Sequence, residues 1–187
     1  MRWATLYARS RQVPAAFAGL LLATAGVWFL ARDSWSPTPV MLTLTAATAL
    51  AAIALSGQDP DLDRTAALPW PVRRFAHLAL IGVAAAGAVL AVQQLGATTV
   101  DMSIILRDAA GLLGLTGLAA TVAGGQFGWT LPLVWAAITP FVPDDGTTTS
   151  HIVAWMVQPA ATSAAAWTSV VLAVTGTAAY TVAGGRR

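Results

Sequence analysis

The sequence predicts an all-α, polytopic membrane protein with about six transmembrane helices, and three observations lead to this fold class. Of its 187 residues, 57% are hydrophobic and only 10% are charged, whereas a soluble domain carries about 25% charged residues. The mean hydropathy is +0.68. The apolar residues also gather in long stretches separated by short polar segments. Because so few polar side chains cannot cover a water-facing globule, lipid is the expected solvent.

Each apolar stretch is assigned to one helix. A helix needs about 20 apolar residues, within a range of about 17–25, to cross the hydrocarbon core. The third, fourth and sixth stretches reach this length, whereas the second and fifth are short and need flanking residues. A tight turn at 124–128 joins the fourth stretch to the fifth. The stretches cover residues 14–30, 40–55, 75–95, 102–123, 127–142 and 160–183.

The arginine residues set the expected orientation. All ten basic residues are Arg, and all eight acidic residues are Asp. With the N-terminus inside, most arginines fall in cytoplasmic segments, which is the bias that the positive-inside rule describes. Both termini are therefore expected in the cytoplasm, and residues 1–187 form one transmembrane domain of the bacterial cytoplasmic (inner) membrane. The arginines on the expected inner side are Arg2, Arg9, Arg11, Arg64, Arg73, Arg74, Arg186 and Arg187.

Two segments outside the spans are expected to lie on the membrane surfaces. In residues 1–13, the side chains of Trp3, Leu6 and Tyr7 share one face at helical spacing. This pattern predicts a short interfacial helix, and the alternative is a basic tail that only sets the topology. Residues 143–159 are expected outside the cell, and the second half of this extracellular segment is predicted to form a short helix on the outer surface.

The cytoplasmic segment 57–74 is the most polar part of the chain. A short helix over residues 60–68 fits it, because acidic residues are favoured in a first helical turn. The segment either docks on a cytoplasmic partner or is a solvated connector. Its acidic spacing lacks the Gly and Glu of a calcium loop, so no metal site is expected. The residues assigned to partner binding are Asp59, Asp61, Asp63, Arg64, Arg73 and Arg74.

Arg107 and Asp108 are the charged residues nearest to a membrane interior. A charge at the bilayer centre costs about 2.5–3.5 kcal/mol on insertion scales, so such residues often mark function. Arg107 follows Asp101 by six residues, roughly 9 Å of helix, which leaves the outer interface within reach. The pair is therefore either structural at that interface or part of a substrate pathway. Gln93 and Gln94 are its expected hydrogen-bond partners.

Glycine spacing predicts one close helix contact. Gly111, Gly114 and Gly117 recur every three residues in the fourth stretch. In lipid, where helices gain little from hydrophobic burial, such small residues let two backbones approach closely. The fourth stretch is therefore expected to pack tightly against another helix.

Catalysis by this chain is not expected. The chain has no Cys, which excludes disulfides and thiolate metal sites. It lacks the serine-hydrolase and zinc-protease motifs, and a P-loop needs a Lys that it does not contain. The net charge is only +2 and the arginines flank apolar stretches, so a nucleic-acid partner is also excluded. His77 and His151 are expected to be surface or packing residues.

Three short motifs and the order of the segments carry a family resemblance. The motifs are RDAAGLLGLTGL at 107–118, GWTLPL at 128–133 and WMVQPA at 155–160. The order is an interfacial helix, two spans, a charged cytoplasmic loop, four more spans and basic ends. In both respects the chain resembles the small six-span permease subunits of type-2 ABC exporters found in actinobacteria.

The resemblance implies a mechanism. Two permease subunits, identical or different, would pair in the membrane, and each would dock a separate ATP-binding subunit through its first cytoplasmic loop, here 59–74. ATP and Mg²⁺ would belong to that partner, and the dimer would export a hydrophobic or amphipathic, antibiotic- or peptide-like compound, as in antibiotic resistance. Two other functions stay open: a non-transporting immunity, anchoring or assembly protein, and a membrane enzyme acting on lipid.

Overall fold

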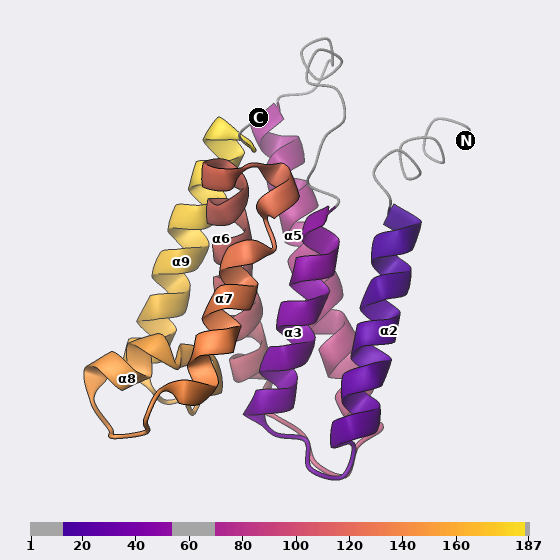
Figure 1. Cartoon of the computed structure of the whole chain (residues 1–187), viewed down its shortest axis with the longest axis vertical. Helices are drawn as coiled ribbons and strands as arrows, with labels where there is room; N and C mark the ends of the chain where they lie inside the picture. The colour runs from indigo at the N-terminus through magenta and orange to yellow at the C-terminus, as the bar shows by residue number, and fades with distance from the viewer. Residues whose placement is uncertain (1–12, 54–69, 186–187) are drawn as a thin grey trace.

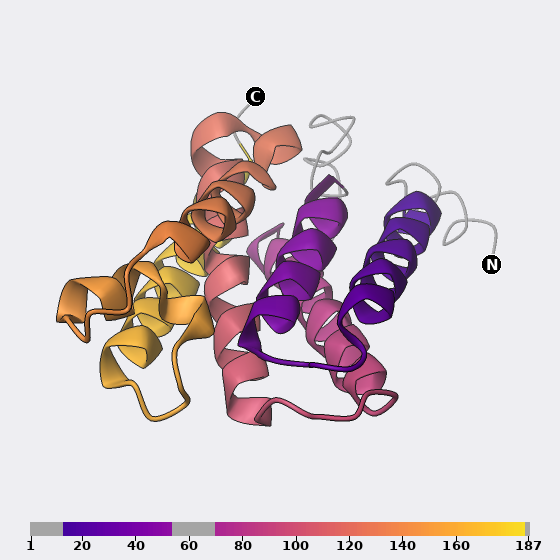
Figure 2. The same ribbon diagram turned by 60° about the horizontal axis from the view of Figure 1, so that its bottom comes forward.

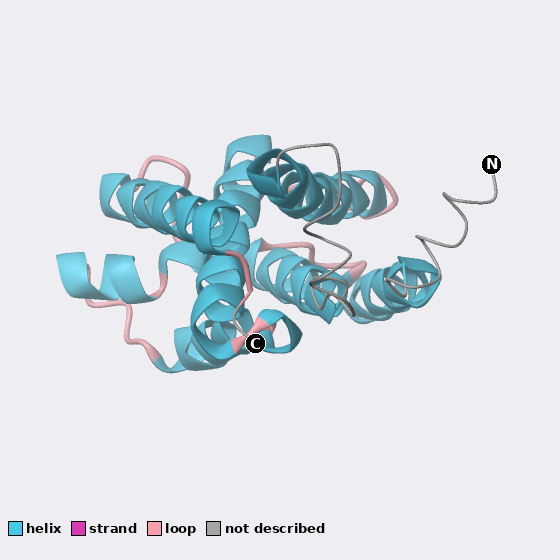
Figure 3. Ribbon diagram, turned by 90° about the horizontal axis from the view of Figure 1, so that it is seen from above, coloured by secondary structure: helices cyan, strands magenta, loops and turns pink. Residues whose placement is uncertain are grey.

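The described part of the chain is entirely helical. The structure, a computed structural model, describes residues 13–53 and 70–185, without the side chains of residues 13–17 and 70. Within these ranges no residue lies in a strand (Figure 3), which confirms the all-α prediction. The elements are α2 (Val13–Ala31), α3 (Pro37–Ala52), α5 (Trp70–Gln93), α6 (Met102–Ala123), η2 (Gly125–Phe127), α7 (Thr130–Ile138), η3 (Thr139–Phe141), α8 (Thr148–Val153), η4 (Trp155–Val157) and α9 (Ser163–Ala183), where η marks a 3-10 helix.

Three of these helices, α5, α6 and α9, are long and apolar enough to cross a membrane. The helices α2 and α3 contribute shorter apolar stretches, Ala18–Ala31 and Pro37–Ala52. Large apolar side chains also cover the outside of the bundle, and on α9 Trp167 is 68% and Val182 79% exposed. Apolar surface on this scale suits contact with lipid rather than water, in agreement with a membrane protein.

The long helices run side by side between two ends of the bundle (Figure 1). The upper end holds the first turns of α2 and α5 and the last turns of α3, α6 and α9. The lower end holds the α2–α3 and α5–α6 connections and α8, and Figure 2 brings this end forward. The two connections are joined there, because the Thr98 hydroxyl donates to the Trp35 carbonyl over 2.8 Å. The described chain therefore begins and ends at the same end of the bundle.

Local signals fix the limits of α6. The Asp101 side chain accepts a hydrogen bond from the Ser103 N–H at 2.7 Å and caps the first turn. The helix ends before Gly124, whose φ of 110° is a conformation that glycine adopts readily. The observed bounds, Met102–Ala123, are those predicted for the fourth apolar stretch.

The tightest contact in the bundle is the crossing of α6 and α9. A Cβ atom added to Gly114 would overlap the backbone of Leu172 and Ala173, and one added to Gly176 would overlap the backbone of Gly114. A Cβ on Gly117 would lie 2.5 Å from the Gly176 carbonyl oxygen. The two helices therefore touch backbone to backbone, which confirms the contact predicted from the glycine spacing.

The fifth apolar stretch, 127–142, does not form one continuous helix. It holds the nine-residue α7, with η2 and η3 before and after it. Two local features explain the interruptions: the 124–128 turn contains three glycines, and Pro140 stands at the start of η3. A single continuous helix over 127–142 is thus corrected to a helix with a 3-10 turn at each end.

The prediction for the second half of the outer segment, 143–159, is also corrected. It was expected to form a short helix on the surface, but it divides into α8 and η4. The side chains of Trp155 and Met156, both in η4, are fully buried. The Trp135 indole N–H on α7 also donates to the Val153 carbonyl at 2.8 Å. This part of the segment therefore turns inward and packs on the bundle.

Arg74 joins the start of α5 to the end of α9. Its guanidinium donates to the carbonyl oxygens of Thr181 at 3.5 Å and Val182 at 3.3 Å. These carbonyls belong to the last turn of α9, where the helix dipole favours a cation. Just after the end of α9, the backbone at Gly184, whose φ is +75°, lies next to this guanidinium. Arg74 thus helps to hold the upper ends of α5 and α9 together, beside the packing of Leu78 and Ile81 with Tyr180.

Replacing Gly184 with alanine is expected to destabilise this junction by about 1 kcal/mol or more. The positive φ disfavours any L side chain, and the added Cβ would lie 2.6 Å from the Arg74 guanidinium carbon. Thermal unfolding in detergent measures the effect. Gly26→Ala is the matched control, because a Cβ at Gly26 meets nothing within 4 Å. Equal melting temperatures for the two variants would contradict the prediction.

Candidate functional site

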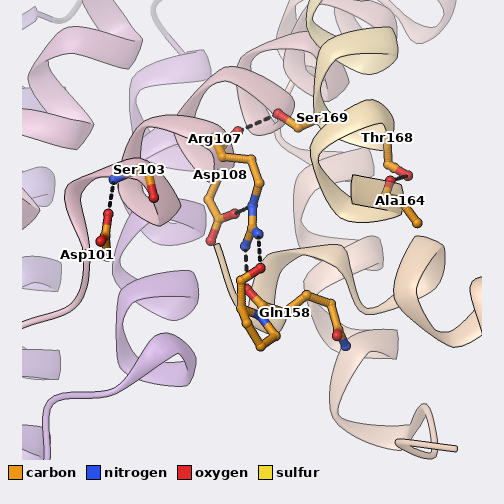
Figure 4. A network of polar contacts seen from close by, with 9 residues as sticks. Asp101, Ser103, Arg107, Asp108, Gln158, Ala164, Thr168 and Ser169 are labelled. Atoms are coloured by element: carbon orange, nitrogen blue, oxygen red, sulfur yellow. Dashed lines mark hydrogen bonds and ion pairs between the residues drawn. The ribbon is translucent and has the colours of Figure 1, made fainter. Parts of the chain in front are cut away.

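Arg107 and Asp108 lie near the lower end of α6 and are both buried. Their side chains are 8% and 0% exposed, and the Arg107 Nε atom lies 2.9 Å from Asp108 Oδ1. Neighbours in sequence normally point to different sides of a helix. Here both side chains extend the same way from the helix, and the guanidinium lies beside the carboxyl group (Figure 4). Because both charged groups are buried, their removal from water carries a large desolvation cost.

The rest of the Arg107 guanidinium holds the outer segment against α6. Its Nη2 atom donates to the Gln158 carbonyl oxygen at 3.0 Å, and its Nη1 atom donates to the Pro159 carbonyl oxygen at 3.2 Å. Both carbonyls belong to the turn between η4 and α9 (Figure 4). One planar group thus binds a carboxyl oxygen and two backbone oxygens at once, which is a geometry that guanidinium suits better than ammonium.

Two further contacts complete this arrangement. The Ser169 hydroxyl on α9 donates to the Arg107 backbone carbonyl at 2.5 Å. One turn along α6, a Cβ added to Gly111 would overlap the ring of Trp155, so the indole occupies the space that this glycine leaves open. These residues from α6, the outer segment and α9 are called the Arg107 cluster: Arg107, Asp108, Gly111, Trp155, Gln158, Pro159 and Ser169.

Two buried polar atoms of the Arg107 cluster have no hydrogen-bond partner among the described residues. They are Asp108 Oδ2 and Trp155 Nε1. Burying a polar atom without a hydrogen-bond partner costs free energy, so each such atom in a folded protein needs an explanation. The described residues hold no group of three metal-ligating side chains. The polar groups of this cluster form one buried ion pair and three hydrogen bonds to backbone carbonyls.

The partners predicted for Arg107 were wrong. Gln93 is buried, and its side-chain oxygen accepts a hydrogen bond from the Val100 N–H at 3.1 Å. It thereby closes the α5–α6 connection instead of reaching α6. Gln94 is exposed. The sequence did mark Gln158 within the WMVQPA motif, but nothing in that motif indicated that its backbone carbonyl would bind an arginine.

Of the other residues assigned from the sequence, only some belong to the described part of the chain. Asp59, Asp61, Asp63 and Arg64 fall outside the described residues. Arg73 and Arg74 lie in the first turns of α5, at the upper end, and Arg74 binds the last turn of α9. The structure therefore places Arg73 and Arg74 at the opposite end of the bundle from the Arg107 cluster.

Replacing Gly111 with alanine is expected to lower the free energy of unfolding by about 1–3 kcal/mol, the usual cost of overpacking a filled site. The new methyl group would overlap the Trp155 ring, which is fully buried and has no room to withdraw. Denaturant titration in mixed micelles measures the change. Combining Gly111→Ala with Trp155→Phe should recover part of the loss, because the smaller ring leaves space. Strictly additive effects would show that the two residues do not interact.

Comparisons with known proteins found no counterpart for this chain. No protein-family model matches it, and neither the curated proteins nor the solved structures contain a match. The resemblance to exporter permeases therefore rests on the sequence motifs and on segment order.

Proposed function

We propose that the chain crosses the membrane six times, with the upper end of the bundle in the cytoplasm. The described chain begins and ends at this end, as an even number of crossings requires. The 16 residues of α3 extend about 24 Å at 1.5 Å per residue, so this crossing needs its flanking residues. The composite of η2, α7 and η3 supplies the fifth crossing. The arginine bias of the sequence places the upper end inside.

On this topology, the chain is the transmembrane subunit of an ATP-driven exporter of hydrophobic or amphipathic compounds. The observation that carries the proposal is the bond between Arg74 and the last turn of α9. Arg74 lies at the edge of segment 57–74, where a cytoplasmic ATP-binding partner would dock. Movement of that segment would therefore be passed directly to α9.

A packed route continues from α9 to the outer side. The backbones of α6 and α9 touch at Gly114 and Gly176, so we expect the two helices to move together. Further down, the Ser169 hydroxyl and the Arg107 guanidinium tie α6 to α9 and to the outer segment. Docking of a partner at one end would thus be mechanically linked to the other end, as an alternating-access subunit needs.

The experiment purifies the tagged chain from membranes of its source organism in mild detergent. A P-loop ATP-binding protein should co-purify, and membrane vesicles should move an amphipathic dye only when ATP is supplied. The combined substitution Asp61→Asn, Asp63→Asn and Arg64→Gln should abolish both results. The matched control is Asp144→Asn with Asp145→Asn in the outer segment. If no ATP-binding protein co-purifies and the triple variant leaves dye movement unchanged, the exporter proposal fails.

One observation favours a second candidate, a non-transporting immunity, anchoring or assembly protein. The centre of the bundle is densely filled, and Leu112, Trp155 and Met156 are fully buried. A static membrane scaffold needs no more than this. In the same experiment, such a protein would co-purify with a partner that has no ATP-binding site. Membrane vesicles that contain it would not transport the dye.

A further inference from the structure

An open groove follows the outside of the bundle where the upper half of α9 lies against the first turns of α5. Figure 1 shows the upper ends of these two helices together. One wall is the ring of Phe75 on α5, which is 54% exposed. The other wall consists of short side chains about one helical turn apart, which therefore share one face of α9. They are Ala173, Val174, Thr177, Ala178 and Thr181.

The lining of this groove is mainly apolar. Its wall on α9 has only Ala, Val and Thr side chains, and the Thr181 hydroxyl donates to the Thr177 carbonyl of its own helix. Both α5 and α9 are long and apolar enough to cross a membrane. A groove on the outside of two such helices is open to the acyl chains of the bilayer.

The length of the groove matches one leaflet. The lining residues on α9 run from position 173 to position 181, which is about 12 Å at 1.5 Å per residue. The hydrocarbon core of a bilayer is about 30 Å thick, so each leaflet contributes about 15 Å. Thr181 lies in the last turn of α9, so the groove extends from the upper end to about the middle of the helix. A single acyl chain of the leaflet at that end fits this length.

Arg74 stands at the upper end of the groove. Its Nη1 atom donates to the carbonyl oxygens of Thr181 at 3.5 Å and Val182 at 3.3 Å, and Thr181 also lines the groove. Both bonds use one nitrogen, whereas a guanidinium carries N–H donors on three. The last carbonyls of a helix together carry about half a negative charge. They therefore balance only part of the charge of Arg74, and the upper end of the groove stays positive.

The aspartates of residues 13–53 and 70–185 lie toward the opposite end. They stand in the α2–α3 and α5–α6 connections, in the first two turns of α6 and in the segment before α8. A groove with an apolar floor and a positive upper end is complementary to a lipid with a negatively charged headgroup. Basic residues beside transmembrane helices attract such lipids, and a guanidinium binds phosphate oxygens well. These aspartates are Asp33, Asp101, Asp108, Asp144 and Asp145.

We propose that this groove binds one anionic phospholipid, with an acyl chain along α9 and the phosphate at Arg74. A second copy of the chain is a poorer occupant. The usual two-fold dimer brings the same surface of both copies together, and two parallel copies would set one Arg74 beside the other. The proposal needs α5 and α9 to lie in the membrane, and it holds whether or not the chain is part of an exporter.

Native mass spectrometry of the full chain, released from detergent, measures lipid binding. Phosphatidylglycerol should bind more tightly than phosphatidylcholine with the same acyl chains. Arg74→Gln should lower the affinity for phosphatidylglycerol about fivefold, the effect of one basic residue near an anionic surface, and Arg74→Lys should retain most of it. Equal affinities of the parent chain for the two lipids would overturn the proposal. So would displacement of phosphatidylglycerol by glycerol phosphate, which has the phosphate without the acyl chains.

A second variant tests the groove without touching Arg74, and it decides the matter even if Arg74→Gln does not fold. Ala178→Phe places a ring in the groove and should reduce phosphatidylglycerol binding. The matched control is Ala84→Phe, at an exposed position of α5 that does not line the groove, and it should bind lipid like the parent chain. Equal lipid binding by the two variants would contradict the proposal. A dimer that Ala178→Phe dissociates while lipid binding is unchanged would assign the groove to a second copy instead.

Photochemical labelling locates the bound lipid. The probe is phosphatidylglycerol with a diazirine in one acyl chain, added to the purified chain in nanodiscs. Illumination should label the stretch 173–181 more strongly than other exposed parts of α5 and α9. Ala178→Phe should remove this preference and Ala84→Phe should keep it. Labelling spread evenly over the two helices would show that the groove holds no particular lipid.

Discussion

Replacing Arg107 with methionine is expected to lower the free energy of unfolding by about 3–5 kcal/mol, the range seen when one partner of a buried polar pair is removed. Methionine fills a similar length but donates no hydrogen bond. Three oxygen atoms would lose their donor together: Asp108 Oδ1 and the carbonyl oxygens of Gln158 and Pro159. Since the first of these belongs to a side chain with no exposed surface, water cannot replace the lost bond there without opening the structure.

A sodium dodecyl sulfate titration in mixed micelles measures this loss, and Asp108→Asn provides the comparison. The amide oxygen of asparagine still accepts from Arg107 Nε, and the guanidinium keeps its two backbone carbonyls. We expect Asp108→Asn to cost less than Arg107→Met, because it removes the negative charge but can keep all three hydrogen bonds of the guanidinium. If the two variants were equally destabilised, the carboxylate charge and not the guanidinium would be the group that holds this site together.

The α6 limits were predictable because their causes are local. An aspartate that caps the first turn and a glycine with positive φ after the last turn both stand next to the helix in sequence. The start of α3 was predicted too late, because hydropathy was the only signal used for it. Hydropathy begins at Val40, but the helix begins at Pro37, since proline fits the first turn of a helix without loss of a hydrogen bond. Apolar content alone marks the apolar part of a helix, whether buried or facing lipid, and not its first turn.

The Arg107 cluster was only half predictable. Two charged residues within an apolar stretch stand out in any sequence, so Arg107 and Asp108 were identified. Their partners were not, because Arg107 binds backbone carbonyls 51 and 52 residues away. A backbone carbonyl has no side-chain signature, and the nearby Gln93 was the more plausible partner by composition. Gly111, one turn beyond Arg107, was a usable signal: a glycine there leaves room for a large side chain, which is Trp155.

Replacing Gly114 with leucine is expected to separate α6 from α9 and to destabilise the protein by about 3 kcal/mol or more, at the upper end of overpacking costs. Even one added carbon would overlap the backbone of Leu172 and Ala173. A backbone cannot rotate out of the way as a side chain can, so the whole of α9 must shift. The Ser169 bond to the Arg107 carbonyl would then be lost as well, because it spans the same pair of helices.

The matched control is Gly87→Leu on α5, which inserts the same side chain at an exposed glycine whose Cβ would meet nothing within 4 Å. This control should unfold like the parent protein, whereas Gly176→Leu should reproduce the Gly114→Leu defect from the opposite helix. Unfolding free energies in micelles separate these outcomes. If Gly114→Leu and Gly87→Leu behaved alike, the α6–α9 contact would tolerate separation. The route from Arg74 to the outer segment could then not depend on a rigid crossing.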